Sequence, residues 1–238
     1  METFYIAILS FIGAGIGTVT GFGSSTVMLP VLLSFYPLPE ALLLAGLVHI
    51  FNDVWQVLFF KDGLRWRLIL EFGLIGALAT FVGARLVFVI PESILNTALG
   101  LFFVAYVVFI FMHSKFKVKH RERTASIGGI VSGFFAGISG LGGAIRSAFL
   151  LAFNLPKEAY VSSIGAIALL TDGVRTAAYY MGGARLSDAL LQGLILFIVM
   201  SFVGAKFAER FIHKISQDKF RAIVAVFLLG FGMKLIFF

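Results

Sequence analysis

Charged side chains inside apolar segments are the residues of this sequence best placed to do chemistry. Asp53 is the only charged residue of residues 41–60, and His49 stands four positions before it. Residues four apart share one face of a helix, so the two side chains are expected to be neighbours. A buried carboxylate beside an imidazole can load and release protons, which predicts a proton relay. The alternative interpretation is a structural polar clamp between helices.

The second half of the chain repeats this pattern with arginines added. Asp172 is followed three residues later by Arg175, on the same helix face, so the two are expected to pair. Asp172 either extends the proton relay or forms a structural clamp with Arg175. Arg146 also interrupts an apolar segment, where a charge costs roughly 2.5–3.5 kcal/mol at the centre of a membrane. It is expected to bind an anion, together with Arg175, or to extend toward the aqueous face.

Two glycine-rich breaks precede short apolar segments. They read Gly21-Phe22-Gly23-Ser24-Ser25 and Gly140-Leu141-Gly142-Gly143-Ala144, and the segments after them cover residues 23–36 and 142–154. A half-helix that begins inside a membrane directs free N–H groups and a positive dipole end at whatever precedes it, a geometry suited to a small anion. Close helix packing is the other reason for such glycines. The candidate binding residues of the breaks are Gly21, Gly23, Ser24, Ser25, Gly140, Gly142 and Gly143.

The elements that must position these residues are transmembrane helices. The chain is 60% hydrophobic and 13% charged, with a mean hydropathy of +1.01, and residues 3–36, 93–112 and 125–145 contain no Asp, Glu, Lys or Arg. About 20 apolar residues span a bilayer as a helix, and loops within lipid would leave backbone groups unpaired. We therefore predict an all-α integral membrane protein, a polytopic bundle with helices near residues 3–20, 23–36, 40–60, 67–90, 93–113, 125–139, 142–154, 157–180, 186–212 and 217–237.

The bundle is predicted to consist of two related halves. The breaks lie 119 residues apart, and the same offset pairs Pro37 with Pro156, Gly46 with Gly165 and Asp53 with Asp172. With a shift of two, residues 81–85 match residues 202–206. The predicted units are a first transmembrane repeat (residues 1–112), a basic linker (residues 113–124) and a second repeat (residues 125–238). Each repeat would open with a glycine-broken hairpin and continue with three spanning helices.

Basic residues predict the orientation. Lys and Arg gather in the linker and at alternate turns, and positively charged short loops favour the cytoplasmic side. We therefore expect a multi-pass plasma-membrane protein with a cytoplasmic linker and both termini outside. An odd number of crossings per repeat makes the second repeat inverted, the common plan of secondary transporters. The pair Gly73-x-x-Gly76 could serve internal packing or a homodimer contact.

Several function classes are disfavoured. The chain has no cysteine, and it contains no G-x-x-x-x-G-K-S/T, H-E-x-x-H or G-x-S-x-G motif. We expect no enzyme activity, no cofactor and no bound metal. The net charge of +7 is attributed to membrane topology, and no nucleic-acid partner is expected. The expected partners are the lipid bilayer and a small anionic substrate.

The duplicated breaks resemble the TauE/SafE family of sulfite exporters. Each break leads to a short helix and then to a proline with Glu-Ala directly after it, at Pro39-Glu40-Ala41, or one residue further on, at Pro156-Lys157-Glu158-Ala159. The resemblance covers essentially the whole chain and implies a permease for small sulfur-containing anions or organosulfonates in bacterial or archaeal plasma membranes. Three features depart from the family pattern: Ser24 and Ser25 in place of a fuller glycine run, His49 and residues 166–168 in place of small hydroxyl residues, and Arg146 in place of an apolar residue.

The resulting expectation is a secondary transporter of a small anion, a sulfur oxyanion or an organosulfonate, coupled to protons through Asp53, His49 and Asp172. The alternative is a transporter of a small cation or metal ion. In that case Asp53 and Asp172, with Asn52 and His49, would supply oxygen and nitrogen atoms to the ion.

Overall fold

A computed structural model describes residues 2–112, 122–153, 155–211, 229 and 233 of this chain. Within those residues the chain forms nine α-helices and one short 3₁₀ helix. The predicted helix near residues 217–237 and most of the linker lie outside the described residues. The elements are α1 (Glu2–Thr20), α2 (Ser25–Leu32), α3 (Leu38–Phe59), η1 (Lys61–Gly63), α4 (Trp66–Leu86), α5 (Glu92–Met112), α6 (Glu122–Ser139), α7 (Gly142–Ala152), α8 (Lys157–Met181) and α9 (Asp188–Phe211).

Both predicted breaks are present, and glycine conformation explains them. α1 ends directly before Gly21 and α6 directly before Gly140, and these two glycines have φ angles of 71° and 70°. Left-handed backbone is strained for residues that carry a Cβ and readily adopted by glycine. The helices that follow are short, with 8 residues in α2 and 11 in α7. Pro37 and Pro156 then precede α3 and α8, where a proline suits the start of a helix.

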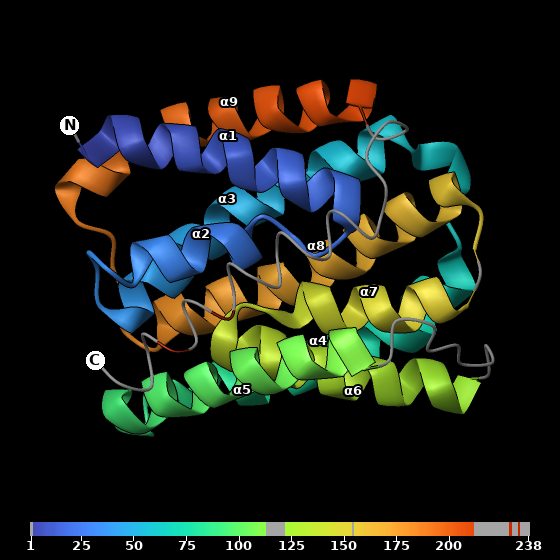
Figure 1. The fold of residues 1–238 in the computed structure, drawn as a ribbon, viewed down its shortest axis with the longest axis horizontal. Helices are drawn as coiled ribbons and strands as arrows, with labels where there is room; N and C mark the ends of the chain where they lie inside the picture. The colour runs from blue at the N-terminus through green and yellow to red at the C-terminus, as the bar shows by residue number, and fades with distance from the viewer. Residues whose placement is uncertain (1, 113–121, 154, 212–228, 230–232, 234–238) are drawn as a thin grey trace.

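The helices lie in three layers (Figure 1). α1 and α9 lie side by side at the top of the view, α3 and α8 cross the middle, and α4, α5 and α6 lie at the bottom. Among the described helices, three are long and apolar enough to cross a membrane: Leu38–Phe59, Trp66–Leu86 and Asp188–Arg210. The outer faces of α4 and α9 expose large apolar side chains such as Leu78 and Ile195, as lipid-facing helices do. The protein is thus a helical membrane protein.

Glycines allow the outer helices to approach closely. Gly83 of α4 lies against the carbonyl of Phe134 in α6, and Gly204 of α9 lies against the carbonyl of Phe11 in α1. Small residues at such positions bring helix backbones into contact, which is how membrane helices gain packing energy without a hydrophobic driving force. Gly73 and Gly76 are also used inside the protein, against α8 and α6 respectively.

The central pair, α3 and α8, runs antiparallel and makes one contact twice. Gly46 of α3 lies against Arg175 and Thr176 of α8, while Gly165 of α8 lies against Gln56 and Val57 of α3. The two sets of positions differ by 119 residues, the offset that relates the halves of the sequence. Asp53 and Asp172 therefore come to the same seam from opposite sides.

Candidate functional site

A group of buried charged side chains fills the seam between α3 and α8. It comprises His49 and Asp53 from α3, Asp172 and Arg175 from α8, and Arg146 from α7; each is no more than 3% exposed. Arg146 interacts electrostatically with both carboxylates and with Arg175, so the five residues form one charge cluster. Helices from both halves thus bring their ionisable side chains to one place.

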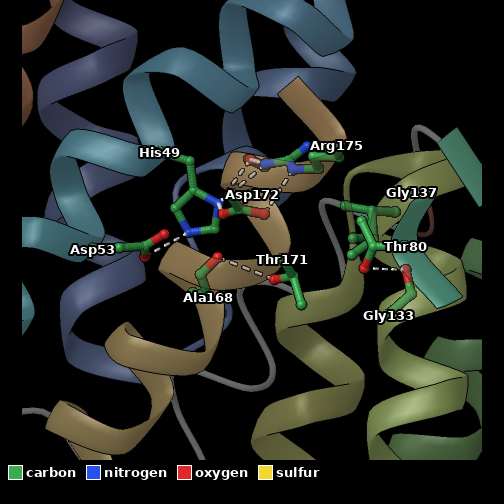
Figure 2. Close-up of polar contacts among 12 residues, drawn as sticks. His49, Asp53, Thr80, Gly133, Gly137, Ala168, Thr171, Asp172 and Arg175 are labelled. Carbon is green, nitrogen blue, oxygen red and sulfur yellow. Dashed lines mark hydrogen bonds and ion pairs between the residues drawn. The ribbon is translucent and has the colours of Figure 1, made fainter. Parts of the chain in front are cut away.

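His49 stands between the two carboxylates (Figure 2). Its Nδ1 lies 2.7 Å from Oδ2 of Asp172, and its Nε2 lies 3.4 Å from Oδ1 of Asp53. The helical spacing predicted the neighbourhood of His49 and Asp53. The shorter contact, to Asp172, joins the two halves of the chain, and no spacing within one helix could have indicated it.

Arg175 ties the cluster to both breaks. Its Nε donates to Oδ1 of Asp172 at 2.6 Å, which is the pairing that the three-residue spacing predicted. Its Nη2 donates to the hydroxyl of Ser25, the first residue of α2, at 2.9 Å. Its Nη1 lies beside Gly140 and has no hydrogen-bond partner among the described residues. One guanidinium therefore touches both α2, which follows the first break, and Gly140 of the second break.

Arg146 is held at one nitrogen only. It lies in the second turn of α7, and its Nη2 donates to Oγ1 of Thr171 at 3.0 Å. Within the described part of the chain, its Nε and Nη1 have no hydrogen-bond partner, although the side chain is only 1% exposed. The side chain ends inside the protein, near the acidic residues, rather than at its surface.

The two breaks contact each other and the charge cluster. Ser147 of α7 donates a hydrogen bond to the carbonyl of Gly21, and Gly143 lies against the carbonyl of Phe22. Gly23 lies against the ring of His49, and the fully buried hydroxyl of Ser24 has no partner among the described residues. Of the predicted glycines and serines, Gly23, Ser25 and Gly140 thus contact the charge cluster. Gly142 differs, because it packs against Ser132 and Ala136 of α6.

Sequence reasoning missed several polar residues that hold the site together. Thr171 positions Arg146, Ser147 joins the two breaks, and Tyr179 donates to the carbonyl of Gly137 in α6. Thr18 of α1 donates to Oδ1 of Asn52 at 3.3 Å. A lone hydroxyl in an apolar helix carries no spacing signal. The one available hint was the position of Thr171, directly beside Asp172.

The same cluster was tested for its fit to a metal ion. One atom each of His49, Asp53 and Asp172 lies within 4.8 Å of the others, a spacing that could hold a cation. However, Oδ1 of Asp172 contacts Arg175 and its Oδ2 contacts His49. A divalent cation would also face the positive charges of Arg146 and Arg175 at short range. These donor atoms therefore fit a divalent metal ion poorly.

Comparison with known proteins adds a family to this geometry. The family model described as "Sulfite exporter TauE/SafE" matches residues 6–235. A curated relative from Methanocaldococcus jannaschii, named a "probable membrane transporter protein", is 24% identical over 255 residues, covering 96% of this chain and 93% of the relative. The resemblance based on the glycine-rich breaks is confirmed by the match.

Proposed function

We propose that this chain, which belongs to the sulfite exporter TauE/SafE family, carries a small anion as a secondary transporter. The family and the apolar helices make the protein a membrane transporter. The proposed substrate is a sulfur oxyanion or an organosulfonate, in keeping with the name of the family.

The observation that carries this proposal is the partly unpaired, buried guanidinium of Arg146. Two of its nitrogens lack hydrogen-bond partners within the described residues, and Nη1 of Arg175 lacks one as well. A buried donor without a partner costs roughly 1–3 kcal/mol, and more when it is charged. The planar guanidinium matches the oxygens of an oxyanion, and the start of α7 adds its own N–H groups. A small oxyanion would satisfy these donors together.

The transport mechanism that we propose is alternating access between two inverted repeats, residues 1–112 and 125–238, joined by the linker at residues 113–124. Support comes from the reciprocal contacts of Gly46 and Gly165 and from the broken helices α1–α2 and α6–α7. Transporters with this plan bind substrate between the repeats, where broken helices meet. We further propose that the linker is cytoplasmic in the plasma membrane, with both termini outside, and that protons couple through Asp53, His49 and Asp172.

Thermal stabilisation of the detergent-purified protein tests the substrate. A ligand that binds the native state raises its apparent melting temperature, by an amount set by its concentration relative to its dissociation constant. We expect sulfite, thiosulfate or sulfoacetate to raise the melting temperature of the wild type and to have no effect on Arg146→Gln. Arg67→Gln, which alters the exposed pair with Glu71, is the matched control and should respond like the wild type. An unchanged response in Arg146→Gln would contradict the assignment of Arg146.

Transport of a small cation is the second candidate, because His49, Asp53 and Asp172 lie close enough to share an ion. It predicts stabilisation by divalent metals alone, abolished in Asp53→Asn. Stabilisation by sulfur oxyanions in metal-free buffer would exclude it as the main activity.

A further inference from the structure

The fixed charges of the site are balanced, but only half of them are paired. Apart from His49, the cluster contains two guanidinium groups and two carboxylates. Asp172 and Arg175 form an ion pair at 2.6 Å. Arg146 and Asp53 form no ion pair within 4.0 Å of each other, and both have polar atoms without hydrogen-bond partners among the described residues. Within that part of the chain, Arg146 therefore has no carboxylate partner, and Asp53 has no guanidinium partner and only the 3.4 Å contact with His49.

The relation between the halves shows why Asp53 has no guanidinium partner. Asp53 and Asp172 are equivalent at the 119-residue offset, and the residue equivalent to Arg175 is Gln56. Gln56 packs on Gly165 as Arg175 packs on Gly46, so the two residues also occupy equivalent places in space. Where the second half supplies a guanidinium to its carboxylate, the first half supplies a neutral amide. The amide oxygen of Gln56 is buried and has no partner within the described residues.

We propose that a single exchangeable monovalent cation, a sodium ion or a proton, takes the place beside Asp53 and Gln56 that a fixed guanidinium takes beside Asp172. An anion at Arg146 would add a negative charge to a balanced site, close to the Asp53 carboxylate. Binding of the anion and of the cation therefore favour each other, one for one. This inference rests on the proposed anion transport and specifies how that transport is coupled.

Every charged or titratable group described around Asp53 bears on this balance. His49 lies on the same helix at 3.4 Å, Asp172 and Arg175 approach from α8, and Arg146 approaches from α7. The opposite charges of Asp172 and Arg175 largely cancel at Asp53, because these two residues form an ion pair. Arg146 is satisfied by the anion, which leaves Asp53 as the carboxylate that needs a cation. Asp53 and Gln56 stand three residues apart on one face of α3, and both carboxylate oxygens and the amide oxygen are buried without hydrogen-bond partners among the described residues. Hard monovalent cations prefer oxygen ligands.

The experiment measures binding of methanesulfonate, which brings no proton of its own, to the purified full-length protein. Calorimetric titrations at constant pH compare sodium gluconate with choline gluconate, and a pH-sensitive dye in weak buffer reports proton uptake. In the wild type we expect sodium to tighten binding about tenfold or more, or one proton to be taken up per anion bound. The first result identifies the cation as sodium and the second identifies it as a proton.

Two substitutions remove the need for the cation by different routes. Gln56→Arg supplies the fixed charge that the second half already has, and Asp53→Asn removes the carboxylate. In both variants methanesulfonate binding should lose its sodium dependence and its proton uptake. Arg67→Gln is the control, because it alters a charge in the exposed pair with Glu71, outside the site, and should keep the coupling. Asp53→Asn keeps the test decisive if Gln56→Arg does not fold.

The outcomes separate the inference from the function on which it rests. Wild-type binding of methanesulfonate with neither sodium dependence nor proton uptake would overturn the cation site while leaving anion transport in place. Coupling that persists in folded Asp53→Asn would also overturn it. A wild type that binds no sulfur oxyanion or sulfonate at all would overturn the proposed function, and the cation site with it.

Discussion

Asp53 and Asp172 occupy equivalent positions in the two halves but have different partners. Asp172 contacts Arg175 and His49 at 2.6 and 2.7 Å, while Asp53 has the 3.4 Å contact with His49. The sequence could indicate the two carboxylates and the pairs formed within one helix. It could not indicate the contacts of His49 with Asp172 or of Arg175 with Ser25, because these depend on how α3, α8 and α2 pack.

The buried pair of Asp172 and Arg175 yields a prediction on stability. Arg175→Gln leaves the buried Asp172 carboxylate without its guanidinium partner and with His49 alone beside it, so we expect the free energy of unfolding to fall by about 3–5 kcal/mol. Unfolding of the detergent-solubilised protein by sodium dodecyl sulfate, followed by circular dichroism, measures this change.

Two control proteins make that measurement specific. The double variant Arg175→Gln with Asp172→Asn removes both charges and should be more stable than Arg175→Gln alone. Glu71→Gln breaks an exposed pair with Arg67 and should change stability by less than about 1 kcal/mol. Equal losses for the buried and the exposed pairs would show that Asp172 gains its stability elsewhere.

The helices themselves followed closely from the apolar runs. The expected segments near residues 3–20, 40–60 and 157–180 correspond to α1, α3 and α8, and both breaks lie at the predicted glycines. The segment predicted near residues 23–36 is shorter in the structure, because α2 ends at Leu32 and a turn precedes Pro37. An apolar run indicates burial, but it cannot show where hydrogen bonding within the helix ends.

The close approach of α1 and α9 yields a prediction at the level of these elements. A methyl group at Gly204 would collide with the carbonyl of Phe11, so Gly204→Ala should force the helices apart and destabilise the protein by about 1–3 kcal/mol. Gly173 of α8 is the matched control, because nothing lies within 4 Å of the place that its Cβ would take. Gly173→Ala should be neutral or stabilising by up to about 1 kcal/mol, since alanine favours the helix. Thermal melting of both variants would reveal the contrast, and equal melting temperatures would contradict the packing.

At the scale of the whole molecule, η1 and Arg185 lie at opposite ends of α8 and therefore at opposite faces of the protein. η1 lies against the start of α8, through the contact of Gly63 with Glu158, and Arg185 lies past the opposite end of α8. Lys61 begins η1, and Arg65 and Arg67 follow it, which supports the proposal that this face is cytoplasmic.

Because the chain has no cysteine, single introduced cysteines can test this orientation. In intact cells a membrane-impermeant maleimide should label Arg185→Cys, whereas Asp62→Cys in η1 should react only after the membrane is permeabilised. The same labelling of both sites in permeabilised cells is the control for reactivity. Labelling of Asp62→Cys alone in intact cells would reverse the proposed orientation.

The reciprocal contacts of α3 and α8 also bear on the evolutionary origin of the chain. If the proposed inverted repeats arose by duplication, their single-repeat ancestor would have assembled as a homodimer with its subunits inserted in opposite orientations. Such a dimer must place identical residues on both sides of its axis, either two arginines or two glutamines where Arg175 and Gln56 now stand. Only after gene fusion could the two positions diverge. The unequal charges of the present site would then date from that fusion, and with them the means to tie the movement of one ion to that of another.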